Sequence, residues 1–135
     1  MLDLPPTEVP AILTVAIGAA LGGVLRLLIT QFVVGRYGAG FAFYATLFIN
    51  VSGSFAIGAI VELAATRTGI GPLWRLFLTT GLLGGYTTFS AFSYEALTLF
   101  SGALTVTAIS YVAASLVLGI GGSLAGIATA RTLAH

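Results

Sequence analysis

The sequence contains no cysteine and no lysine, and its five basic residues are all arginine. Without cysteine the chain cannot form a disulfide, bind a metal through thiolates or attack a substrate with a thiol. The arginines are spread along the chain, so they do not form the clustered basic face that nucleic-acid binding requires. We therefore exclude thiol chemistry and expect no nucleic-acid partner.

Charge of either sign is scarce in this chain. Charged residues make up 7% of the 135 residues, hydrophobic residues make up 58%, and the mean hydropathy is +1.09. A soluble domain could not cover its surface with so few charges, so the chain must lie in a lipid bilayer. About 20 apolar residues cross a bilayer as one helix, which allows four crossings joined by short turns. The sequence predicts one all-α transmembrane domain over residues 1–135.

Apolar stretches provide these crossings. The predicted spans cover about 11–34, 41–65, 73–100 and 103–130. Pro5, Pro6 and Pro10 predict an irregular segment before the first span. Because no basic residue precedes that span, we interpret it as a retained helix and not as a signal peptide. Small residues four positions apart predict close approach of the helix backbones; the pairs are Gly18/Gly22, Ser54/Gly58, Gly81/Gly85 and Gly122/Gly126.

The centre of the third span predicts a break in the helix. Gly84 and Gly85 are followed by Tyr86, Thr87 and Thr88, and the adjacent glycines disfavour a continuous helix. A break at membrane depth frees backbone carbonyls, which protein, water or a bound ion must satisfy. Broken membrane helices are therefore typical of ion sites.

Aromatic and hydroxyl side chains follow this break. Phe89 and Phe92 lie three residues apart, so they share one helical face, with Ser90 offset from them. Aromatic rings have positive edges, and two rings presented edge-on could surround a small anion. On the fourth span, Tyr111 and Ser115 lie four residues apart, and their hydroxyls could donate to the same anion.

Polar side chains at membrane depth should face protein or water, because lipid exposure is expensive. Asn50 offers two donors without a charge, which fits either a bond between helices or an anion site, and Thr46 one turn earlier extends either role. Arg26 fits either a side chain that reaches the headgroups or an electropositive vestibule. Glu95 fits an arginine partner, a wet vestibule or a proton-coupled carboxylate.

Three motifs carry a resemblance to a known family. They are Gly22-Gly23-Val24-Leu25-Arg26, then Asn50-Val51-Ser52-Gly53-Ser54-Phe55 with Gly58, and Thr80-Gly81-Leu82-Leu83-Gly84-Gly85-Tyr86-Thr87-Thr88-Phe89-Ser90-Ala91-Phe92-Ser93 with Glu95. In these motifs, in length and in the order of its spans, the chain resembles the small bacterial fluoride channels called Fluc or CrcB. The similarity covers nearly the whole chain, and the third motif is long and specific.

The resemblance implies a homodimer of oppositely oriented subunits, which encloses two fluoride pores in the bacterial inner membrane. It also implies a central sodium ion held by the backbone carbonyls of Gly84 and Thr87. The positions that we expect to line the fluoride pore, from the motifs and from their neighbours on the same helix faces, are Arg26, Thr46, Asn50, Phe89, Ser90, Phe92, Tyr111 and Ser115. The family often carries a threonine where Ala91 stands, and a hydroxyl one turn after Ser115, where this chain has Gly119.

The predicted function is passive, fluoride-selective permeation in the export direction, which protects the cell from fluoride and needs no catalysis. Two alternatives are kept. A small proton-coupled multidrug exporter also has four helices, but it needs a carboxylate buried in its first helix, where this chain has Arg26. A non-transporting membrane subunit would leave the polar interruptions at Asn50, Thr87 and Tyr111 without a use.

Overall fold

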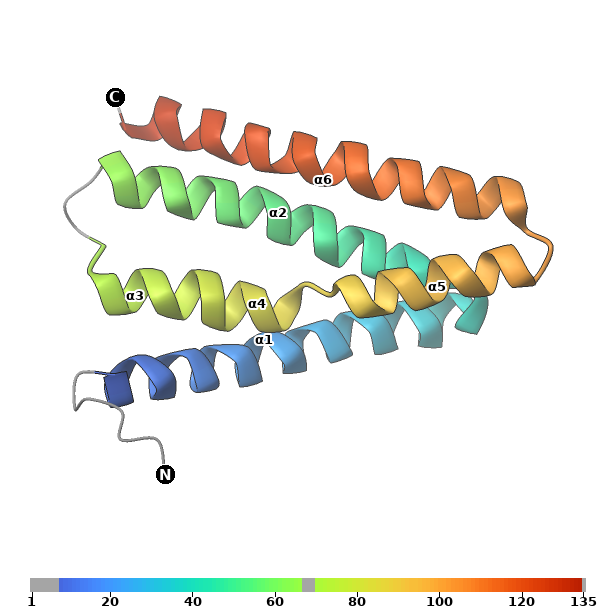
Figure 1. The fold of residues 1–135 in the computed structure, drawn as a ribbon, viewed down its shortest axis with the longest axis horizontal. Helices are drawn as coiled ribbons and strands as arrows, with labels where there is room; N and C mark the ends of the chain where they lie inside the picture. The colour runs from blue at the N-terminus through green and yellow to red at the C-terminus, as the bar shows by residue number, and fades with distance from the viewer. Residues whose placement is uncertain (1–7, 67–69, 135) are drawn as a thin grey trace.

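The computed structural model describes residues 8–66 and 70–134, and the described chain is almost entirely helical. Its elements, in chain order, are α1 (Glu8–Tyr37), η1 (Ala39–Phe41), α2 (Ala42–Thr66), α3 (Pro72–Leu76), η2 (Phe77–Leu83), α4 (Gly84–Tyr86), α5 (Phe89–Ser101) and α6 (Thr105–Ala134). Figure 1 shows rows of helix side by side: α1, then α3 to α5 end to end, then α2, then α6. Along the chain the direction reverses from α1 to α2, again from α2 to α3–α5, and again to α6. The neighbouring helices α2 and α6 are therefore parallel.

The predicted spans coincide with these rows, with corrections at their ends. The first helix begins at Glu8 and includes Pro10, where an irregular segment was predicted, whereas Pro5 and Pro6 lie outside the described residues. Proline is tolerated in the first turn because the backbone N–H that it lacks has no partner inside the helix. The same helix continues past the expected stop at residue 34 to Tyr37, and the turn follows at Gly38, whose φ of 101° suits glycine.

The helices α3 to α5 form the third span along the chain, which is called the third row from here on. This row is broken, but not at the glycines. Gly84 and Gly85 are helical, whereas Thr87 (φ −78°, ψ 157°) and Thr88 (φ −151°, ψ 117°) are extended. The expectation that the glycine pair starts the break was therefore wrong. The turns before the break are wider than those of an α-helix, because η2 is a π-helix, a form that is often found at functional sites.

The glycine pairs have a different use, which is close packing between rows. A Cβ at Gly22 would clash with the carbonyl oxygen of Leu82, and one at Gly85 would clash with that of Ala19. On the other side of the bundle, a Cβ at Gly126 would clash with the carbonyl oxygen of Phe55. The predicted small-residue contacts are therefore present, and they join α1 to the third row and α2 to α6.

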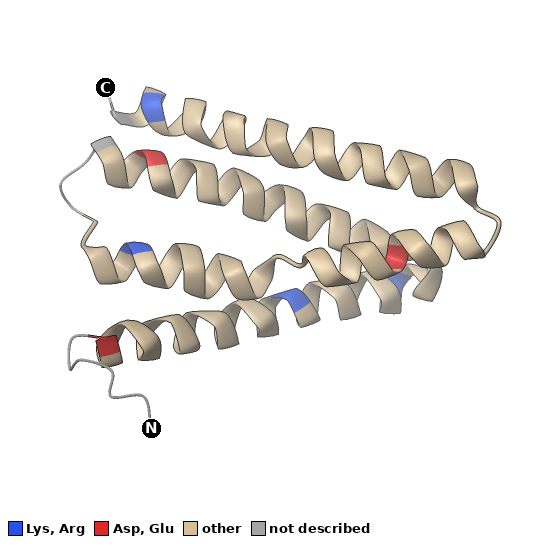
Figure 2. Cartoon of the chain, in the orientation of Figure 1, with Lys and Arg blue, Asp and Glu red and all other residues tan. Residues whose placement is uncertain are grey.

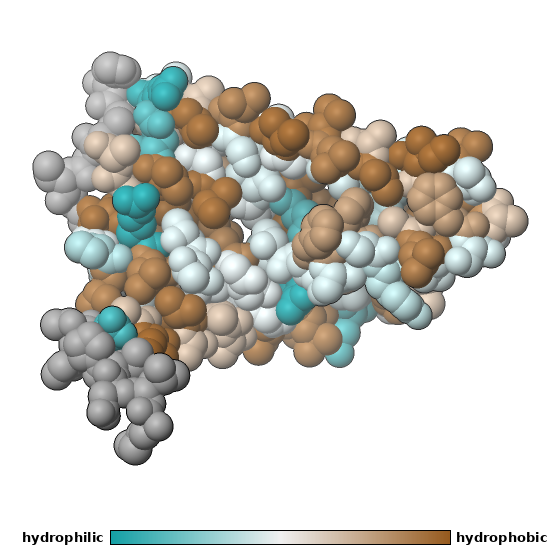
Figure 3. Space-filling model, viewed as in Figure 1, coloured by the Kyte–Doolittle hydropathy of each residue, from teal (hydrophilic) through white to brown (hydrophobic). Residues whose placement is uncertain are grey.

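The outer surface is that of a membrane protein. Many large apolar side chains point outward, for example Phe32, Val106 and Val117, and Figure 3 shows apolar residues along the flanks of the molecule. Charged residues are few, and Figure 2 shows most of them toward the helix ends. Within the described ranges, three helices are long and apolar enough to cross a membrane; the third row differs because its break divides it into shorter helices.

Candidate functional site

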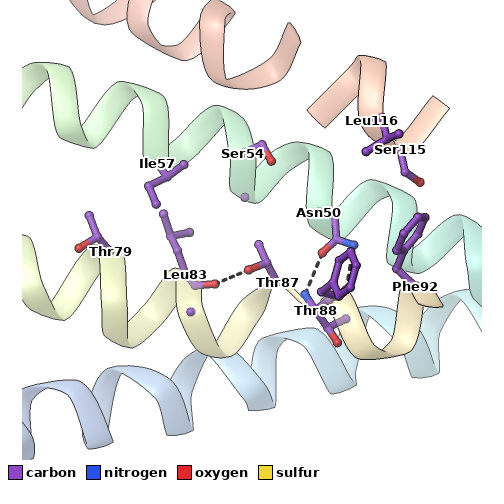
Figure 4. Close-up of a pocket in the computed structure, with 13 residues that line it drawn as sticks. Asn50, Ser54, Ile57, Thr79, Leu83, Thr87, Thr88, Phe92, Ser115 and Leu116 are labelled. Atoms are coloured by element: carbon purple, nitrogen blue, oxygen red, sulfur yellow. Dashed lines mark hydrogen bonds between the residues drawn. The ribbon is translucent and has the colours of Figure 1, made fainter. Parts of the chain in front are cut away.

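The break in the third row is held by one side chain from α2. The Asn50 Nδ2 group donates to the Thr88 carbonyl oxygen at 3.0 Å, and the Thr88 backbone N–H donates to Asn50 Oδ1 at 2.8 Å (Figure 4). The amide thus replaces the helical acceptor that the Thr88 N–H loses, and it adds a donor to the Thr88 carbonyl, which as the N-cap also accepts the first bond of α5. Of the two alternatives for Asn50, the bond between helices is observed, and it leaves the second hydrogen of Nδ2 available.

The same break diverts the donors of two carbonyl groups. In a continuous helix the Gly84 carbonyl would accept from the Thr88 N–H, which instead bonds Asn50. The Thr87 carbonyl would accept from the Ala91 N–H, which instead bonds Thr88 Oγ1 at 3.2 Å and caps α5. Both carbonyls therefore lack the donors of a regular helix, and such uncharged oxygens suit a hard cation.

A cavity of about 400 Å³ lies beside the break. Its lining combines apolar side chains with a few amide and hydroxyl groups from α2, η2, the break and α6. The polar members are Asn50, Ser54, Thr79, Thr87, Thr88 and Ser115, and the aromatic members are Phe89 and Phe92. No acidic or basic residue is among the lining residues, so the described cavity offers uncharged donors and ring edges to a ligand.

The two phenylalanines are close together, as their spacing indicated. Their ring centroids lie 5.6 Å apart with the planes tilted by 46°. Phe92 also contacts Tyr111, with 5.3 Å between the centroids, whereas the side chain of Phe89 is 78% exposed in the isolated chain. Phe92 therefore belongs to the interior wall of the cavity, and Phe89 extends from the surface of the chain.

Ser115 carries an unusual hydroxyl group. Its Oγ atom is buried and has no hydrogen-bond partner in the part of the chain that the structure describes. Buried polar atoms are nearly always hydrogen-bonded, because leaving one unpaired costs roughly 1–3 kcal/mol. Since Ser115 lines the cavity beside Asn50, a ligand or a water molecule there would satisfy it.

Glu95 is held by two hydroxyl groups. Thr46 Oγ1 donates to Glu95 Oε1 at 2.8 Å, and the Tyr111 hydroxyl donates to Glu95 Oε2 at 2.7 Å. The observed partners of Glu95 are therefore these two hydroxyl groups and not the arginine that was considered. Thr46 and Tyr111, which are expected among the pore residues, thus direct their hydroxyl protons to this carboxyl group in the structure.

The structure brings only part of the predicted pore set together. Asn50, Phe89, Phe92 and Ser115 line one cavity with Gly84 and Thr87, and Thr46 and Tyr111 meet beyond its lining at Glu95. Arg26 and Ser90 are outside that lining. The side chain of Arg26 is half-buried on α1, and the Ser90 hydroxyl lies 3.3 Å from Thr88 Oγ1 on an exposed part of α5.

Among the polar members of the cavity, Ser54, Thr79 and Thr88 were absent from the predicted site. Thr79 lies in the π-helical segment, which no local pattern indicated. Ser54 was noted only as a small packing residue, although Thr46, Asn50 and Ser54 recur every four residues and therefore share one face of α2. Extending the polar face by one more turn would have included Ser54 in the predicted site.

Comparison with known proteins identifies the family of the chain. Residues 13–127 match the family model described as CrcB-like protein, Camphor Resistance (CrcB). The chain is 44% identical over 122 residues to a protein of Rhizobium meliloti (strain 1021) named fluoride-specific ion channel FluC, covering 90% of this chain and 97% of that protein. A protein of the same name from Granulibacter bethesdensis is 46% identical over 121 residues, with 90% and 94% covered. The counterpart from Roseiflexus sp. (strain RS-1) is 45% identical over 122 residues, with 90% and 98% covered. The chain thus belongs to the CrcB family of membrane proteins.

Proposed function

We propose that this protein is a fluoride-selective channel that lets fluoride cross the membrane passively. The names of its relatives support the choice of ion. The observation that carries the proposal is the buried hydroxyl of Ser115, which has no partner in the described residues and belongs to a residue that lines one cavity with Asn50 and Phe92. A small anion would accept from such a donor, and no catalytic step is required.

Selectivity follows from the chemistry of the lining. Fluoride is small and strongly hydrated, so a pore must replace its water with closely placed donors. The hydroxyl of Ser115, the remaining Nδ2–H of Asn50 and the positive ring edges of Phe92 are donors without charge. Uncharged donors bind an anion weakly enough to release it, which permeation requires.

The channel is proposed to be a homodimer of oppositely oriented subunits. The break supports this arrangement, because the Gly84 and Thr87 carbonyls, whose helical donors bond elsewhere, need a cover other than lipid, and Phe89, 78% exposed, lies beside them. A second copy placed over the break would bury Phe89 and complete the wall of the cavity. Purified protein in detergent should behave as a dimer by light scattering, and a monomer that conducts fluoride would contradict the arrangement.

A structural sodium ion is proposed at the centre of that dimer. The carbonyls of Gly84 and Thr87, whose helical donors bond elsewhere, are the groups that would hold it. The ion would neutralise partial negative charge at the break and join the subunits there. Replacing sodium with a large organic cation should weaken the dimer and lower fluoride flux, whereas indifference of both to sodium would contradict the site.

The bacterial inner membrane is the proposed location, and export the proposed direction. The relatives named above are bacterial proteins, and the apolar helices of this chain suit a lipid bilayer. With the cell interior electrically negative, an anion that crosses passively is driven outward. Fluoride sensitivity of a bacterial strain that lacks its own channel should therefore fall when this chain is expressed.

The proposal is tested by replacing the hydroxyl that carries it. Ser115→Ala removes one donor and little volume, so fluoride efflux from liposomes should fall roughly tenfold, the effect of about 1.4 kcal/mol on a barrier. Ser101→Ala, on an exposed turn at the end of α5, is a control that should leave efflux unchanged. Wild-type liposomes that retain their fluoride would contradict the function itself.

A further inference from the structure

The parallel helices α2 and α6 bring matching positions together on three successive turns, and the first two of these levels are polar on both helices. Thr46 and Tyr111 meet at Glu95, and one turn further along both helices Asn50 and Ser115 line the cavity. One more turn brings Ser54 opposite Gly119, where an added Cβ would lie 3.7 Å from Ser54 Oγ. The first two levels have a polar side chain from each helix, and the third has only the hydroxyl of Ser54.

The Ser54 hydroxyl is free to act as a donor. The backbone carbonyl of Ser54 accepts a hydrogen bond from Ser123 Oγ at 3.1 Å, but its own Oγ has no hydrogen bond within the described residues. Ser54 lines the cavity together with Asn50 and Ser115, and Figure 4 shows Ser54 and Asn50 on consecutive turns of α2. Successive levels are about 6 Å apart along the helix axis, from a rise of 1.5 Å per residue.

We propose that the Ser54 hydroxyl is a further ligand for the permeating anion, placed one helical turn beyond Ser115 and Asn50. This inference rests on the proposed fluoride function and assigns it an additional donor from α2. Gly119 makes the position possible, because its missing side chain leaves the space on α6 that Ser54 faces. An anion that leaves the Asn50 and Ser115 level would then pass to a neutral hydroxyl instead of an apolar wall.

The experiment compares fluoride efflux from liposomes containing wild-type protein, Ser54→Ala and Ser52→Ala. Ser54→Ala should lower efflux about fivefold, corresponding to the loss of one hydrogen bond of about 1 kcal/mol. Ser52→Ala is the matched control, since this serine is on the same helix but its hydroxyl lies 2.9 Å from the Tyr86 hydroxyl, outside the cavity lining. Wild-type efflux in Ser54→Ala, or an equal loss in Ser52→Ala, would overturn the inference while leaving the fluoride function intact.

A rescue separates a donor from a packing residue. In the Ser54→Ala background, Gly119→Ser places a hydroxyl in the same gap from α6, and the 3.7 Å clearance is ordinary contact distance. The double variant should recover most of the lost efflux. The single variant Ser54→Thr, which keeps the hydroxyl, should show fluoride efflux close to that of wild type. A double variant no better than Ser54→Ala, despite an unchanged oligomeric state, would assign Ser54 to packing and overturn the inference. If wild-type protein passes no fluoride, the fluoride function fails as well.

Discussion

The Asn50 side chain satisfies both backbone groups of Thr88 across 38 positions of sequence. This pair of bonds joins the middle of α2 to the break in the third row, and therefore fixes the geometry from which the cavity and the diverted carbonyls follow.

Replacing Asn50 with alanine should destabilise the protein. The change leaves the Thr88 N–H without a partner and removes one donor from the Thr88 carbonyl, which costs roughly 1–3 kcal/mol at a site that water reaches poorly. Thermal unfolding in detergent, followed by loss of the monodisperse elution peak, measures the effect. Ser54→Ala lies one turn away and removes a hydroxyl without a partner in the described chain, so it is the control; equal unfolding temperatures for the two variants would contradict this role of Asn50.

Two adjacent glycines of α1 should respond in opposite ways to alanine. Gly22→Ala places a methyl group against the Leu82 carbonyl, which must push α1 away from the third row and cost roughly 1–3 kcal/mol. At Gly23 an added Cβ meets nothing within 4 Å, so Gly23→Ala should be neutral or stabilise the helix by up to about 1 kcal/mol. Unfolding temperatures of the two purified variants decide the matter, and equal destabilisation would show that the interface is not as described.

The hydroxyl of Tyr111 should contribute to stability through Glu95. Tyr111→Phe keeps the ring contacts to Phe43 and Phe92 but removes one of the two donors to the carboxyl group, at a cost of roughly 1–3 kcal/mol. Tyr94→Phe removes the hydroxyl of a side chain that is 72% exposed, and it should be silent. The pair is compared by thermal unfolding; a silent Tyr111→Phe would mean that the bond to Glu95 contributes nothing.

The two phenylalanines should affect flux more than folding. Phe89→Ile and Phe92→Ile keep an apolar side chain but remove the positive ring edge, so fluoride efflux should fall at least about tenfold if the edges help to replace water. Size-exclusion chromatography should show the same oligomeric state as wild type. Unchanged conductance in both variants would remove the ring edges from the account.

The positions of the rows were readable from the sequence because long apolar stretches and small-residue spacings are local signals. The place of the break was not. Gly84 and Gly85 resemble helix breakers, but both are helical. The glycine at position 85 is needed because the backbone there lies against Ala19, and only the fold reveals that neighbour. The extended residues are Thr87 and Thr88, and Asn50 accepts from the Thr88 N–H, which no longer bonds the Gly84 carbonyl.

The candidate site was predicted in part for the same reason. The spacing of Phe89 and Phe92 is a property of one helix, and their rings do lie together. The bonds from Thr46 and Tyr111 to Glu95 join three helices, so no local pattern could show that these donors are already engaged. Ser54 had a local signal in the four-residue repeat of polar residues on α2, but its significance depends on the gap at Gly119 across the interface.

The central claim is that fluoride crosses this protein passively and selectively. The most direct test follows fluoride efflux from liposomes with an electrode, with chloride measured in parallel, under a membrane potential and with the proton gradient abolished. We predict fast fluoride efflux that needs no proton gradient, with chloride retained. Slow, saturable efflux that requires a proton gradient, or equal release of chloride, would contradict the claim.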